Sequence, residues 1–330
     1  MNILAIILPV IAVTALGYIL AYSQYLNKTQ IDGLSKITFN ILMPSFLFVT
    51  MATSNISEQF NLNIMLAFYL PVLSFYLLLL AYHYHFAPQH KQQLGSAAVY
   101  AMGNTYSNVV LLGLPVTLSA LGAQYAAYVF LILSVHGIIM IGFTNFCGAF
   151  NPEHSNPEHS NPKHSNPKHS NQQAPAPTTA LSKIWRMISN PILASIAGGM
   201  LYNLLGFGLH HTIKDTLTLL GKPGITCALL ILGSSLHFYS VKGQRKQIAA
   251  TTIVKLVLLP FAVYLSATYL FDLTADLRAV VVILSASPTG VNAYLVASSV
   301  NKHQALVAST VVITTVLCMF SMAAWLLVVL

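Results

Sequence analysis

Long apolar stretches alternate with short polar connections along almost the whole chain. Ten of these stretches approach the length of about 20 residues that an α-helix needs to cross about 30 Å of hydrocarbon. The pattern therefore predicts ten membrane-spanning helices, of which the fourth and ninth are the least regular. The ten stretches cover residues 2–22, 33–54, 63–86, 95–121, 125–149, 184–207, 212–239, 247–271, 277–300 and 304–329.

A polar segment divides the ten predicted spans into five and five. Residues 151–182 contain four tandem copies of Asn-Pro-Glu/Lys-His-Ser, which favour turns and break helices, so we expect a disordered or extended linker. Its histidines could bind a metal ion, but a solvated tether lengthened by duplication is the simpler interpretation. These histidines are His154, His159, His164 and His169. The predicted units are a five-helix repeat at 1–150, this linker, and a second five-helix repeat at 183–330.

Basic residues are concentrated in alternate connections between the predicted spans. If the N-terminus lies outside, 11 of the 15 Lys and Arg residues fall in cytoplasmic connections and 2 in outer ones, with Lys222 and Lys255 inside spans. Positive charge marks the cytoplasmic side. We therefore expect a multi-pass cell-membrane protein with both termini outside and the linker in the cytoplasm. Because each half has an odd number of spans, homologous halves would form an inverted repeat.

Composition supports a membrane environment and excludes some functions. The chain is 56% hydrophobic and 7% charged, whereas soluble domains carry about 25% charged residues. The net charge of +8 comes mainly from basic residues in the loops between the predicted spans, so no nucleic-acid partner is expected. The three cysteines lie far apart in apolar stretches, which predicts free thiols. The first stretch lacks a basic start and a cleavage site, so we expect a span there and not a signal peptide.

The fourth and ninth predicted spans are both interrupted by glycine, proline and polar residues. Proline removes a backbone donor, and freed backbone groups in hydrocarbon must face protein or a water-filled cavity. Two matching interruptions therefore predict a shared polar site near the midplane, typical of transporters, although simple kinks are an alternative. The candidate residues of this site are Asn104, Asn108, Gly113, Pro115, Pro288, Thr289, Gly290 and Asn292.

Charged groups inside the predicted spans favour an anionic substrate. Lys255 falls near the middle of the eighth span, and no Asp or Glu lies well inside any span. Such a lysine is costly and marks a functional site. It could be stabilised by an anion, by carbonyl ends of broken helices, or by losing its proton. Lys222 can extend its long side chain outward. His136 could relay protons, although a packed interhelical hydrogen bond is the simpler interpretation.

Short motifs follow one another along nearly the whole chain outside the linker. They are Gly33-Leu-Ser-Lys, Met43-Pro-Ser-Phe-Leu-Phe48, Asn108 to Gly113-Leu-Pro115, Asn190-Pro191, Lys255-Leu with Pro260, Ser287-Pro-Thr-Gly-Val-Asn-Ala293, and Ser309-Thr to Trp325. In their order and spacing the chain resembles the auxin efflux carrier family, which includes plant PIN-type carriers and bacterial permeases assigned to malate and malonate. The sequence departs from the family at Lys222-Pro-Gly, where small apolar residues are expected.

This resemblance implies an architecture and a binding site. The architecture is ten helices in two inverted five-helix repeats, with the fourth and ninth helices broken and crossing. Spans 1, 2, 6 and 7 would form a scaffold, and spans 3–5 and 8–10 a moving unit. The crossing would hold the substrate, which points to Asn108, Pro115, Pro288 and Asn292, while Lys255 matches a basic position common in the family.

We therefore expect a secondary transporter of a small organic anion, such as malate, malonate or an auxin-like acid, that works by an elevator-type movement. A membrane sensor with a carrier-like fold is the alternative. An intramembrane enzyme is disfavoured, because no paired carboxylates or nucleophile-base arrangement is visible. No cofactor or bound metal is expected. The coupling ion, sodium or proton, stays open, and a homodimer is compatible with the sequence.

Overall fold

The computed structural model describes residues 3–54, 62–86, 93–149, 191–206, 208–238, 245–300 and 302–330. Within these ranges the chain is helical and contains no strand, only one isolated β-bridge. Among the described residues, seven helical stretches are long and apolar enough to cross a membrane, as expected for a polytopic helical membrane protein. The linker predicted at 151–182 lies outside the described residues.

The first half of the chain contains the first five predicted spans. A π-helical turn, η1, joins α2 to α3, and the fourth predicted span is divided between α6 and the continuous pair η3–α7. The elements are α1 (Ile3–Tyr22), α2 (Lys28–Ile37), η1 (Thr38–Leu42), α3 (Met43–Thr53), α5 (Leu62–Phe86), α6 (Leu94–Thr105), η3 (Val109–Gly113), α7 (Leu114–Leu121), η4 (Ala123–Tyr125) and α8 (Ala126–Ala149).

The second half of the chain contains the last five predicted spans. The eighth predicted span is a continuous helix with two π-helical turns, and the ninth is divided between α14 and α15. The elements are α10 (Pro191–Leu204), α11 (His211–Phe238), α12 (Arg245–Ile253), η6 (Val254–Leu258), α13 (Leu259–Leu265), η7 (Ser266–Leu270), α14 (Ala275–Ala286), α15 (Val291–Ser299) and α16 (Gln304–Val329).

Three π-helical turns each lie directly before a proline. The turns η1, η3 and η6 are followed by helices whose second residues are Pro44, Pro115 and Pro260. A proline has no N–H and its ring clashes with the carbonyl four residues earlier. Widening the preceding turn moves that carbonyl away from the ring, so the helix continues past the proline without breaking.

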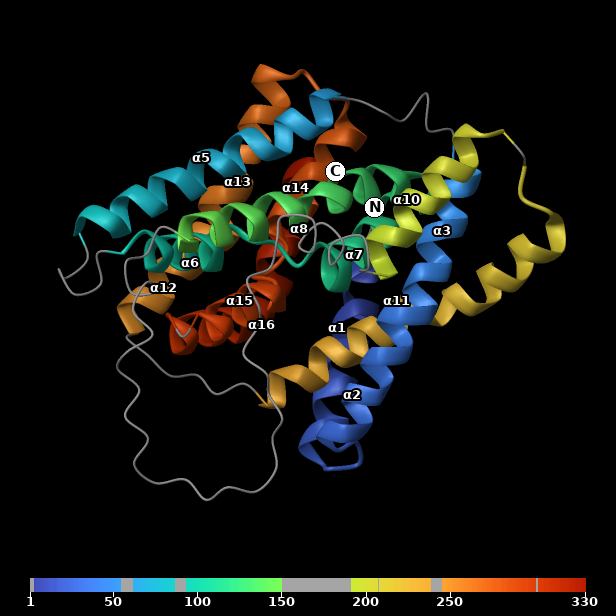
Figure 1. Cartoon of the computed structure of the whole chain (residues 1–330), viewed down its shortest axis with the longest axis horizontal. Helices are drawn as coiled ribbons and strands as arrows, with labels where there is room; N and C mark the ends of the chain where they lie inside the picture. Colours follow the sequence, from blue (N-terminus) through green and yellow to red (C-terminus); the bar gives the residue numbers. More distant parts are fainter. Residues whose placement is uncertain are drawn as a thin grey trace.

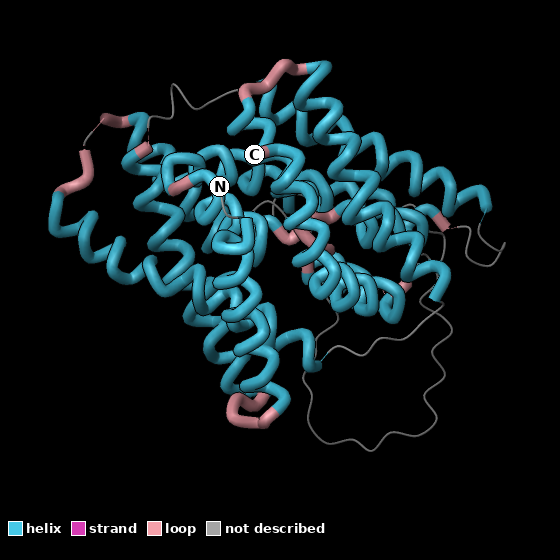
Figure 2. The backbone as a smooth tube through the Cα atoms, turned by 180° about the vertical axis from the view of Figure 1, so that it is seen from behind, coloured by secondary structure: helices cyan, strands magenta, loops and turns pink. Residues whose placement is uncertain are grey.

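The helices form two groups, which Figures 1 and 2 show from opposite sides. Helices α1, α2, α3, α10 and α11 make one group, and α5, α6 and α12 to α16 lie on the other side of the molecule. Within the first group, α1 packs on α11 and α3 packs on α10. A β-carbon at Gly233 would lie 1.8 Å from the Thr14 carbonyl oxygen, and one at Gly17 2.2 Å from that of Leu230. Here the helix backbones touch directly, which is typical of tight packing in membranes.

Candidate functional site

The two broken helices cross, and their broken segments hydrogen-bond to each other. Residues 106–108 separate α6 from η3, and residues 287–290 separate α14 from α15. The Asn108 N–H donates to the Pro288 carbonyl at 2.8 Å, and the Gly290 N–H donates to the Tyr106 carbonyl at 3.0 Å. Ser107 and Thr289 form an antiparallel bridge between these hydrogen bonds. Each broken segment thus satisfies backbone groups that the other segment leaves free.

Two of the predicted glycines allow the crossing segments to approach closely. A β-carbon at Gly290 would lie 2.6 Å from two ring carbons of Tyr106. A β-carbon at Gly113 would lie 2.9 Å from both Leu284 Cδ2 and Ser287 Oγ. Pro115 does not contact the opposite segment through any described hydrogen bond. Its role in the geometry is to end the π-helical turn η3 and begin α7.

The two predicted asparagines of the first half leave buried polar atoms without partners. Asn108 Oδ1 accepts from the Leu111 N–H at 3.2 Å, which fixes the orientation of the amide. Asn104 Nδ2 donates to the Tyr100 carbonyl at 2.8 Å. Among the residues that the structure describes, Asn108 Nδ2 and Asn104 Oδ1 have no hydrogen-bond partner. Leaving such a group unpaired costs about 1–3 kcal/mol, so each of these atoms is an unsatisfied polar group beside the first broken segment.

Lys255 connects the first broken segment to the end of α14. Its side chain is fully buried (0% exposed) and extends from the π-helical turn η6. Lys255 Nζ donates to Ser107 Oγ and to the Ser285 carbonyl, both at 2.7 Å. Ser285 lies in the last turn of α14, whose carbonyls lack helical partners. The sequence left open three ways of stabilising this lysine. The structure shows one of them, the carbonyl end of a broken helix.

Two aromatic side chains lie at the crossing beside the predicted residues. Asn292 Nδ2 donates to the Tyr106 hydroxyl at 3.1 Å. The Tyr106 ring stacks on the ring of His136 from α8, with centroids 4.7 Å apart. His136 Nε2 accepts from the Ser107 N–H at 3.3 Å, which is the packed interhelical hydrogen bond expected for this residue.

The remaining contacts at the crossing involve residues that the sequence did not identify. The Thr289 N–H donates to Thr314 Oγ1 of α16, and Thr289 Oγ1 donates to the Gly103 carbonyl, both at 3.1 Å. Ser107 could have been found, because it lies in the same polar run as Asn104 and Asn108. Thr314 lies inside an apolar span, and nothing in the local sequence distinguishes it.

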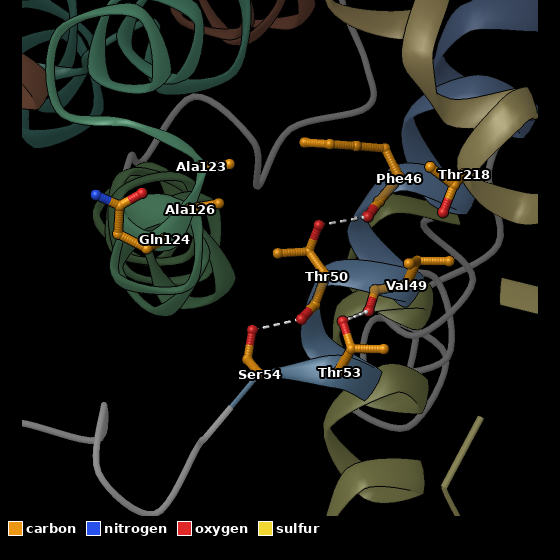
Figure 3. A pocket seen from close by; sticks show the side chains of 9 residues that line it. All are labelled: Phe46, Val49, Thr50, Thr53, Ser54, Ala123, Gln124, Ala126 and Thr218. Carbon is orange, nitrogen blue, oxygen red and sulfur yellow. Dashed lines mark hydrogen bonds between the residues drawn. The ribbon is translucent and has the colours of Figure 1, made fainter. Parts of the chain in front are cut away.

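A cavity of about 410 Å³ lies away from the crossing, between α3 and α11 on one side and the start of α8 on the other (Figure 3). None of its lining residues is charged, and none is a predicted site residue. The hydroxyls of Thr50 and Thr53 point along α3 and donate to the carbonyls of Phe46 and Val49, both at 2.8 Å. The lining residues are Phe46, Val49, Thr50, Thr53, Ser54, Ala123, Gln124, Ala126 and Thr218.

The comparison with known families covers almost the entire chain. A family model described as a membrane transport protein matches residues 2–326. No curated protein matches the sequence. The match includes both broken helices and Lys255, and also His136 beside them.

Proposed function

Since the chain belongs to the family of membrane transport proteins that includes the auxin efflux carriers, we propose that it is a secondary transporter of a small organic anion. The substrate class is a mono- or dicarboxylate such as malate, malonate or an auxin-like acid. The proposed binding site is the crossing, with Asn104, Asn108, Asn292 and Lys255 as its polar side chains. The remaining predicted residues, Gly113, Pro115, Pro288, Thr289 and Gly290, shape its backbone.

The observation that carries this proposal is the buried ammonium of Lys255, which binds the first broken segment and the end of α14. Its two neutral acceptors, Ser107 Oγ and the Ser285 carbonyl, offset its burial only in part, and no carboxylate bridges it among the described residues. A bound carboxylate would supply the missing negative charge in a region of low dielectric. The unpaired Nδ2 of Asn108 adds a hydrogen-bond donor for the same ligand.

The packing supports an elevator-type movement between the two groups of helices. Direct backbone contacts at Gly17 and Gly233 hold α1 and α11 together as a scaffold. The cavity lies at the boundary between this scaffold and the start of α8. A tight scaffold beside an incompletely filled boundary suits a movement of α5 to α8 and α12 to α16 as a unit.

The same packing supports an inverted repeat of five helices and five helices. The first helix of each half packs on the second span of the other half, α1 on α11 and α10 on α3. This reciprocal exchange is expected when two halves are related by a pseudo-two-fold axis in the membrane plane. With the basic loops in the cytoplasm, both termini would face outward.

The test is uptake of labelled mono- and dicarboxylates by the purified protein in liposomes. We expect Lys255→Ala and Asn292→Ala to reduce uptake by about tenfold or more, because each removes a group that holds the substrate or the crossing. Lys255→Met, which keeps most of the side-chain volume, should reduce uptake equally.

Lys222→Ala is the matched control, because Lys222 is exposed on α11 and should not affect uptake. Wild-type uptake by correctly inserted Lys255→Ala and Asn292→Ala variants would contradict the proposed site. Failure of the wild type to transport any carboxylate would contradict the proposed substrate class.

A further inference from the structure

His136 is a titratable side chain buried beside the crossing, and the proposed site does not use it. It lies on α8 with a relative exposure of 1%. Its ring centroid is 4.7 Å from that of Tyr106, 5.7 Å from that of Phe68 and 6.1 Å from that of Tyr69. The imidazole is therefore enclosed by aromatic rings from α5 and from the first broken segment.

The hydrogen bond from Ser107 determines the protonation state of this imidazole. Nε2 accepts from the Ser107 N–H, so it must carry a lone pair and the neutral ring must carry its proton on Nδ1. Within the described part of the chain, Nδ1 has no hydrogen-bond partner. A doubly protonated imidazolium has no lone pair. A proton and the Ser107 N–H therefore compete for the same lone pair of Nε2.

The same serine connects His136 to Lys255. Ser107 Oγ accepts from Lys255 Nζ at 2.7 Å, while the Ser107 N–H donates to His136. The other titratable groups around the ring are the hydroxyls of Tyr106, which accepts from Asn292, and Tyr69, which donates to the Ile132 carbonyl. No carboxylate is in hydrogen-bond or ion-pair contact with His136 in the described structure. A proton on His136 thus adds a second positive charge near that of Lys255, because both side chains hydrogen-bond to Ser107.

We propose that His136 is the proton-binding site of this carrier and that it couples the entry of one organic anion to the entry of a proton. This inference rests on the proposed function. A bound carboxylate offsets the charges of both Lys255 and His136, so anion and proton bind more favourably together than separately. By linkage, each increases the affinity for the other, which favours transport of the two together. Protonation also releases the Ser107 N–H, so proton binding changes the crossing itself.

The experiment compares the wild type with His136→Gln in liposomes that contain a pH-sensitive dye. A glutamine oxygen can accept from the Ser107 N–H, but the side chain cannot take up a proton. Counterflow of labelled malate and malonate measures movement of the anion, and the dye measures movement of the proton. We expect wild-type uptake to acidify the interior, and His136→Gln to reduce this acidification about tenfold while counterflow stays within about threefold.

His85→Gln is the matched control, because His85 is exposed at the end of α5 and should preserve both signals. Acidification by His136→Gln at the wild-type ratio to counterflow would overturn the proton site and leave the proposed function intact. If the variant does not reach the membrane, the wild type decides: uptake with no acidification, or with alkalinisation, overturns symport. A wild type without malate or malonate counterflow would overturn this inference and count against the proposed substrate class.

Discussion

At the scale of single residues, the crossing depends on glycines, which have no β-carbon, as much as on polar groups. The residue types of the broken segments were predictable, because glycine, proline and asparagine in a membrane span mark irregular backbone. Their partners were not predictable. Lys255 reaches Ser107 across 148 residues, and Thr289 reaches Gly103 across 186 residues. Local patterns of hydrophobicity contain no information about such distant pairs, so the pairing of Lys255 with Ser107 and Ser285 was not predicted.

Gly290 provides a test of this close approach. Its φ of −72° is open to any residue, so replacement by alanine acts only through the added β-carbon 2.6 Å from Tyr106. We expect Gly290→Ala to displace the Tyr106 ring, destabilise the protein by about 1–3 kcal/mol and strongly reduce uptake. Thermal unfolding in detergent and liposome uptake measure the two effects.

The control for this substitution is Gly142→Ala on α8, where an added β-carbon would meet nothing within 4 Å. This variant should unfold and transport like the wild type. If Gly290→Ala also unfolds and transports like the wild type, the crossing is more open than the structure indicates.

At the scale of helices, side chains of α16 hold the π-helical turn η6, which contains Lys255. The Leu256 carbonyl would normally accept from the residue four positions later, but that residue is Pro260, which has no N–H. Two side chains of α16 replace the missing donor: Trp325 Nε1 at 2.9 Å and Ser321 Oγ at 2.8 Å. The proline was visible in the sequence. The widened turn and its two donors from α16 were not, because they depend on tertiary packing.

We expect these two donors to substitute for each other. Trp325→Phe and Ser321→Ala should each cost about 1 kcal/mol beyond any loss of packing, because one donor remains. The double variant should lose more stability than the sum of the two single variants, since it removes both side-chain donors to this carbonyl in an apolar environment. A double-mutant cycle of thermal unfolding measures this coupling, and simple additivity would contradict it.

At the scale of the whole molecule, the hydrophobic pattern predicted the order and type of the helices well. Apolar stretches of a fixed length are a direct consequence of bilayer thickness, so they are readable without any tertiary information. The division into two groups was expected only from the family resemblance. Direct backbone contacts hold α1 and α11 together within one group, and a cavity lies between α3 and η4. Neither feature is encoded in a local pattern.

The elevator-type movement can be tested by linking the two sides of the cavity. Thr50 lies on α3 and Ala123 lies opposite it at the start of η4 (Figure 3). In a background without the three native cysteines, we expect Thr50→Cys with Ala123→Cys to lose uptake when a short bifunctional thiosulfonate joins them. A reducing agent should restore uptake.

A linked pair inside the scaffold is the control. Asn203 of α10 donates to the Ser54 carbonyl at 2.7 Å, so Ser54→Cys with Asn203→Cys joins two elements of the same group. Linking this pair should leave uptake intact. Full uptake by the linked Thr50–Ala123 pair would show that α3 and η4 do not move apart during transport.

The mutual hydrogen bonds of the two broken segments also have a consequence for the order of events during synthesis. A ribosome adds about 5–20 residues per second, so the first segment waits on the order of 10 s for its partner, because Pro288 follows Asn108 by 180 residues. Until then its free backbone groups and the hydroxyl of Ser107 have neither Lys255 nor residues 287–290 to bind. The first half of the chain therefore enters the membrane before these contacts can form, and the proposed transport site is completed only when the second half arrives.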